Sequence, residues 1–143
     1  MTEISLFVRI PGQAPRRSVS ILLLAALACH GHHVPVSVGG LYSVRADQSG
    51  YQIVKVLALD PQVVHVRLYK NTFSDRPKTL DLSTLELGTM KDPDGFGIGH
   101  LPISPRQFES WDPVFVMQAV VNDDELEGYR IWQESKGGVW EPK

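Results

Sequence analysis

The chain has 143 residues, of which 43% are hydrophobic and 21% are charged. These values are close to those of globular domains and exclude a disordered chain, a collagen-like repeat and a coiled coil. Residues 41–143 hold eleven lysines and arginines against fifteen acidic residues. Binding to nucleic-acid phosphates requires clustered cations, so we expect no nucleic-acid partner for this acidic part.

The first 38 residues differ in character from the rest. An apolar run within residues 18–29 follows Arg16 and Arg17 and includes Ala28 near its end. This order is typical of a secretory signal, which would be cleaved after Ala28 and export the protein. The alternative, which we favour, is that residues 1–38 are a wrongly started, poorly ordered segment of a cytoplasmic protein. The run is shorter than the roughly 20 apolar residues that span a bilayer, so we expect no stable membrane span.

Three antiparallel strands are predicted next. Residues 41–46 and 51–59 are rich in apolar and β-branched side chains and are joined by the turn-forming sequence DQSG, which indicates a hairpin. A second turn at Pro61 leads to a strand over residues 63–70. In this third strand the side chains alternate: Val64, Val66 and Leu68 fall on one face, and His65, Arg67 and Tyr69 fall on the other.

The pattern is less regular beyond the third strand. Residues 80–87 contain leucines that suit either a short helical turn or an edge strand, and residues 91–104 are rich in glycine and proline and predict a long loop. Ser104 and Pro105 then mark the start of a short helix. Residues 114–121 predict a fourth strand, apolar enough to be central.

The last predicted element is a C-terminal helix. Asn122 is its N-cap, and the acidic residues 123–125 suit the positive end of the helix dipole. Two glycines at 137–138 are expected to end the helix. Its apolar side chains recur at helical spacing and are expected to pack on the sheet: Leu126, Tyr129 and Trp132.

These elements predict an α+β fold for a single globular domain over residues 39–143. It would be a small SH3-like antiparallel β-barrel, or a bent meander, with a short helix and the C-terminal helix packed on it. Residues 39–70, GGLYSVRADQSGYQIVKVLALDPQVVHVRLYK, resemble the opening of several small bacterial SH3-like barrel proteins, including some immunity proteins that neutralise polymorphic toxins. The resemblance covers about a quarter of the chain and implies no functional residue.

The main candidate site follows the polar face of the third strand into the next loop, and its residues are Arg67, Tyr69, Asn71, Phe73 and Arg76. Arginine grips carboxylates or stacks on rings, and tyrosine combines a rigid face with a hydroxyl, which is typical of recognition surfaces. We therefore expect a groove for a protein or peptide partner, flanked by the loop over residues 91–103. The alternative is that these aromatic side chains pack beneath the C-terminal helix.

A second candidate site is catalytic. His100 would act as a general base, oriented by Asp92 or Asp94, in a small hydrolase. No recognisable motif supplies a nucleophile, however. We expect no metal ion or other cofactor, because Cys29 is the only cysteine and the histidines of the globular part number only two.

The sequence thus favours a bacterial, non-catalytic module that binds a protein or peptide. One alternative is a toxin-neutralising, immunity-type protein, which would present an exposed acidic patch to a basic partner. The other alternative is the small hydrolase that uses His100.

Overall fold

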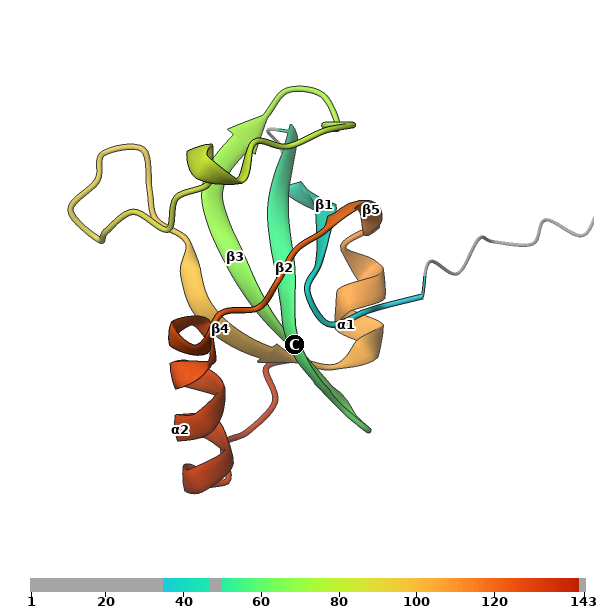
Figure 1. The fold of residues 1–143 in the computed structure, drawn as a ribbon, viewed down its shortest axis with the longest axis vertical. Coiled ribbons are helices and arrows are strands. Elements are labelled where there is room, and N and C mark those ends of the chain that lie inside the picture. The colour runs from blue at the N-terminus through green and yellow to red at the C-terminus, as the bar shows by residue number, and fades with distance from the viewer. Residues whose placement is uncertain (1–34, 47–49, 142–143) are drawn as a thin grey trace, which may run out of the picture. The chain divides into compact units, whose positions relative to one another are not determined.

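The computed structural model describes residues 35–46 and 50–141. Within them a five-stranded antiparallel sheet has the strand order β4-β3-β2-β1-β5 (Figure 1). The strands are β1 (Gly40–Ala46), β2 (Gly50–Asp60), β3 (Val63–Phe73), β4 (Ile98–Ile103) and β5 (Val114–Gln118). The α-helices are α1 (Pro105–Ser110) and α2 (Glu127–Ser135), and the 3₁₀ helices are η1 (Leu82–Thr84) and η2 (Asp123–Leu126).

The predicted α+β class agrees with this architecture, but the SH3-like barrel is not confirmed. The first four strands form a meander, and β5 returns to pair with β1. The sheet is open, because β4 and β5 lie at its two edges and do not pair with each other.

The sheet has two chemically different faces, as the alternation in the third strand predicts. One, here called the apolar face, packs against α1 through a buried cluster: Tyr42, Val44, Val54, Val56, Val64, Val66, Ile103 and Phe108. The opposite, mixed face carries a smaller apolar cluster around Leu41, Ile53 and Tyr69. Because side chains alternate along a strand, Lys55, His65 and Arg67 also belong to the mixed face.

Two strand predictions are wrong. The sequence predicts a loop over residues 91–104, but residues 98–103 form β4, which pairs with β3. Pro102 is compatible with this strand because β4 lies at the edge of the sheet, where the outer side of the backbone meets Trp140 through an isolated bridge and not a further strand of the sheet. The sequence also predicts a central strand over residues 114–121, but β5 pairs only with β1, whose other side is taken by β2.

The helical predictions are largely confirmed. Ser104 caps α1 by accepting a hydrogen bond from the Gln107 amide. The region 80–87 contains the single 3₁₀ turn η1 and no strand. The C-terminal helix starts as η2 and continues as α2. It ends one residue before the predicted glycines at 137–138, because Lys136 has a φ of 50°, in the left-handed region.

Residues 1–34, which include the signal-like run, lie outside the described residues. In the part of the chain that is described, no helix is long and apolar enough to cross a membrane.

Candidate functional site

The mixed face of the sheet contains a buried ion pair. The Lys55 ammonium in β2 lies 2.6 Å from Glu125 Oε2 in η2, and each side chain is only 6% exposed. Lys55 also donates a hydrogen bond of 2.6 Å to the carbonyl of Val120. The segment between β5 and α2 is therefore held across the face of the sheet, where Figure 1 shows it passing in front of β2 and β3.

The Glu125 carboxylate also contacts Asn122 and Arg67. Its Oε2 accepts a hydrogen bond of 2.8 Å from the Asn122 amide, and its Oε1 lies 3.3 Å from Arg67 Nη1. Arg67 is 16% exposed and also donates to the carbonyl of Gly99. One carboxylate is thus shared by two cations, which leaves this group of side chains with a net charge of +1.

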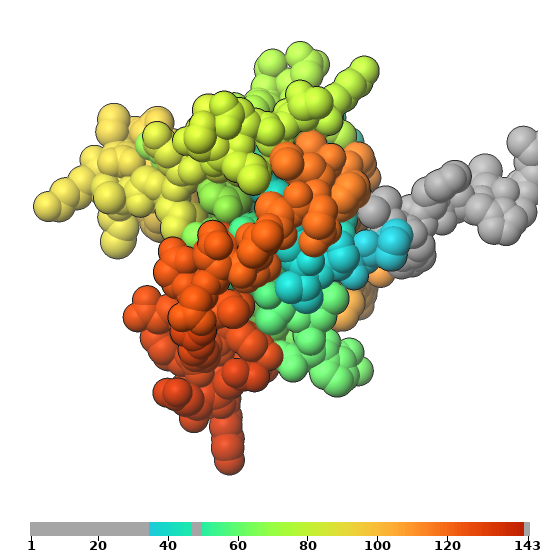
Figure 2. Space-filling model, viewed as in Figure 1, coloured from blue at the N-terminus to red at the C-terminus, as the bar shows by residue number. Residues whose placement is uncertain are grey.

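A cavity of about 380 Å³ lies above the ion pair. It is placed between the yellow-green segment that contains η1 and the orange segment that follows β5 (Figure 2). Apolar side chains form most of its wall, and its lining residues are Leu41, Lys55, Tyr69, Leu82, Leu85, Ala119, Val120, Asn122 and Glu125. A cavity with an apolar wall and a few polar groups at one place is typical of binding sites.

Three of the residues predicted for binding contribute to this region in different ways. Tyr69 lines the cavity, and burial together with the negative charge of Glu125 raises the pKa of its hydroxyl, which therefore stays protonated. Phe73 packs in the same cluster as Tyr69. Asn71 donates to the Thr84 carbonyl and accepts from the Glu86 amide, so it fixes the segment that forms one wall.

Arg76 is held elsewhere. Its guanidinium donates to the carbonyl and hydroxyl oxygens of Ser43, and it forms an ion pair of 2.8 Å with Asp112. It also lies 4.5 Å from the centre of the Tyr51 ring, within range of a cation–π interaction. The structure brings Arg67, Tyr69, Asn71 and Phe73 onto β3, but it does not place Arg76 at the cavity.

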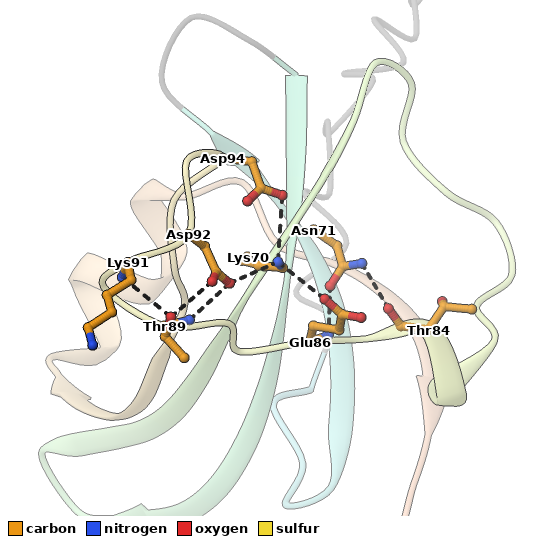
Figure 3. A network of polar contacts seen from close by, with 8 residues as sticks. All are labelled: Lys70, Asn71, Thr84, Glu86, Thr89, Lys91, Asp92 and Asp94. Carbon is orange, nitrogen blue, oxygen red and sulfur yellow. Dashed lines mark hydrogen bonds and ion pairs between the residues drawn. The ribbon is translucent and has the colours of Figure 1, made fainter.

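The two aspartates of the catalytic hypothesis gather around Lys70 (Figure 3). The Lys70 ammonium lies 3.1 Å from Asp92, 3.2 Å from Glu86 and 3.5 Å from Asp94, and hydrogen bonds to Asp92 and Glu86 raise its pKa. These contacts attach the loop before β4 to the end of β3. Neither aspartate is in hydrogen-bond or ion-pair contact with His100.

His100 instead belongs to a chain of hydrogen-bonded polar groups, of which His65 is fully buried and Asp60 and His100 are partly buried. Its Nε2 lies 3.0 Å from His65 Nδ1, and His65 Nε2 lies 2.9 Å from Asp60 Oδ2. An ionised Asp60 only accepts, so the bonds are consistent if His65 donates to Asp60 and accepts from His100. Burial lowers the pKa of His65, although its contact with Asp60 acts in the opposite direction. The pKa of His100 is lowered to about 4, mainly by burial and to a smaller extent by the neighbouring His65.

The histidine chain is covered by α2. The rings of Tyr129 and Trp132 lie 4.6 and 4.5 Å from the His65 ring, centre to centre, and the Tyr129 hydroxyl donates to Asp60 at 3.4 Å. Among the described residues, no serine, threonine or cysteine is hydrogen-bonded to either imidazole. The arrangement therefore joins β2, β3, β4 and α2 through hydrogen bonds and ring contacts.

Close packing between α2 and β4 depends on Gly128. A Cβ atom at this position would lie 2.5 Å from Cβ of His100, so we expect Gly128→Ala to displace the helix. Overpacking of this kind costs about 1–3 kcal/mol, of which the better helix propensity of alanine offsets at most about 1 kcal/mol. Because the nearest atom is Cβ of His100, which cannot rotate away, we place the cost in the upper part of this range and expect urea denaturation to show a net loss of roughly 1–2 kcal/mol. Gly138→Ala is the matched control, since a methyl group at that position would have no neighbouring atom within 4 Å, and equal stability of the two variants would contradict the prediction.

Sequence reasoning missed Lys55 and Glu125. Lys55 is the only charged residue between Tyr51 and Leu59, and its neighbours along the mixed face of β2, Ile53 and Leu57, are buried. A buried charge requires a partner, so this apolar surrounding could have identified Lys55 as a paired residue from the sequence. Nothing local identifies Glu125 as that partner, because 70 residues separate the two.

Comparison with known proteins gives no further guide to this site: no family model, no curated protein and no solved structure matches the chain. Within residues 35–46 and 50–141, no three His, Cys, Asp or Glu side chains are arranged to hold a metal ion.

Proposed function

We propose that this protein is a non-catalytic binding module that takes a protein or peptide segment into the cavity above Lys55 and Glu125. The observation that carries the proposal is the cavity itself, which combines an apolar wall with a buried polar floor. Leu82 and Val120 stand at its rim with 44% and 78% of their surfaces exposed. Exposed apolar side chains beside a cavity are suited to contact with an apolar part of a partner.

The alternatives fit the geometry less well. A hydrolase that uses His100 with Asp92 or Asp94 has no observation in its favour, because both aspartates contact Lys70. A toxin-neutralising role would be a special case of the proposal, in which the bound partner is a toxin.

A selection from random peptides tests the proposal. Phage that display peptides either internally or with free C-termini would be selected on the immobilised full chain. We expect enriched peptides to bind the Leu82→Gln/Val120→Gln double variant at least tenfold more weakly, because that variant removes two apolar side chains from the rim.

The control is the double variant Ile131→Gln/Val139→Gln, which removes two exposed apolar residues that do not line the cavity. Enriched peptides should bind it as they bind the unmodified chain. The proposal fails if no peptide is enriched, or if both double variants weaken binding equally.

A further inference from the structure

In the cavity, Lys55 has a hydrogen-bond donor without an acceptor among the described residues, whereas the oxygens of Glu125 already have partners. A lysine ammonium has three N–H donors, and Lys55 directs one to Val120 and one to Glu125. No third protein acceptor is hydrogen-bonded to it in the described part of the chain. Glu125, by contrast, accepts hydrogen bonds from Lys55 and the Asn122 amide on Oε2, and its Oε1 forms an ion pair with Arg67. The third N–H of Lys55 is therefore available to a ligand, while both oxygens of the Glu125 carboxylate already contact other groups.

The charges point the same way. Lys55 and Arg67 share the single negative charge of Glu125, so these three side chains carry one excess positive charge; Lys55 and Glu125 line the cavity, and Arg67 adjoins Glu125 without lining it. Tyr69, whose hydroxyl stays protonated because its pKa is raised, adds a neutral side chain that can donate. A group that accepts hydrogen bonds and carries a negative charge complements this floor, and a carboxylate meets both requirements.

Apolar wall lies immediately beside the spare donor. Leu41 is the direct cross-strand neighbour of Lys55, and Val120 both lines the cavity and accepts a hydrogen bond from the ammonium. A ligand must then present a carboxylate and an apolar group within the dimensions of one residue. The last residue of a polypeptide does this when its side chain is apolar, because the carboxylate and the side chain are attached to the same carbon atom. An internal aspartate or glutamate separates its carboxylate from the nearest apolar side chain by further bonds.

We propose that the cavity binds the C-terminal carboxylate of a partner polypeptide whose last residue is apolar. This inference rests on the proposed function and specifies its ligand. The carboxylate accepts the third hydrogen bond of Lys55, and the terminal side chain contacts Leu41, Leu85 and Val120.

The first test compares free and blocked C-termini. A peptide enriched on the full chain from the free C-terminal library would be synthesised as the acid and as the amide, and the dissociation constants would be measured by fluorescence anisotropy. We expect the terminal residue to be apolar and amidation to weaken binding at least tenfold. Equal affinities of acid and amide would overturn the inference. If only internally displayed peptides are enriched, the ligand is not a C-terminus, and the proposed binding function stands without it.

The second test changes the charge at the rim. Leu82→Asp and Leu82→Lys remove the same exposed leucine and differ in the charge that they place beside the cavity. We expect the acid peptide to bind Leu82→Asp at least fivefold more weakly than Leu82→Lys at low salt, and the amide to bind both alike. The same affinity of the acid for the two variants would also overturn the inference. Failure of every library to yield a binder would instead reject the proposed function.

Discussion

Glu125→Leu is expected to lower the free energy of unfolding by about 3–5 kcal/mol, because it leaves the ammonium of Lys55 buried without a counter-ion. The substitution also removes the acceptor of the Asn122 amide and the partner of Arg67, but Arg67 is more exposed and reaches water more easily. Urea denaturation at neutral pH measures the effect. A loss below about 1 kcal/mol would show that the ion pair is not buried as the structure has it.

The double variant Lys55→Met/Glu125→Leu shows how much of the lost stability comes from the unpaired ammonium. It removes the ion pair without leaving a buried charge behind. Replacing both members of a buried ion pair with apolar residues is often close to neutral. The Asn122 amide and Arg67 still lack their partner in the double variant, so we expect it to recover only part of the loss and to be about 2 kcal/mol more stable than Glu125→Leu alone. If it were less stable than the single variant, the unpaired ammonium could not be the cause of the loss.

Acidification is expected to destabilise the fold through the histidine chain. An unfolded histidine has a pKa near 6.5, whereas the pKa of His100 in the folded chain is lowered to about 4. The unfolded state therefore binds more protons between these values, and the stability present above pH 6.5 is lost as the pH falls towards 4. For His100 this loss should be about 2 kcal/mol, less than the full effect of such a shift, because its side chain is only partly buried.

The matched variant is His100→Gln. Its side-chain amide keeps a donor for His65 Nδ1 but does not titrate in this range. The difference in unfolding free energy between pH 7 and pH 4 should be smaller in this variant than in the unmodified chain. Protonation of the carboxylates affects both proteins alike, so identical pH profiles would exclude His100 as the source of the effect.

Part of the candidate site could be predicted from the sequence. The alternation in β3 places Arg67 and Tyr69 on one face, and this follows from the two-residue period of a strand. What the side chains do on that face could not be predicted in the same way. Tyr69 lines a cavity and Arg67 contacts Glu125 only because the segment after β5 crosses the sheet, which no local pattern records.

By itself the sequence determined the features that depend on neighbours along the chain. The hairpin of β1 and β2, the two faces of β3 and the Ser104 cap of α1 follow from side-chain periodicity and local hydrogen bonding. Such interactions join residues a few positions apart, so their pattern is visible in the order of the residues.

Only the tertiary structure decided the open sheet, the edge position of β5, and the contacts of His65 with His100 and of Lys55 with Glu125. Each of these depends on segments distant in sequence, and the hydrophobic effect that drives them together is non-directional. An apolar strand suits the centre or the edge of a sheet equally well until its neighbours are known. A buried charge likewise shows that it needs a partner, while the path of the chain through space determines which residue becomes that partner.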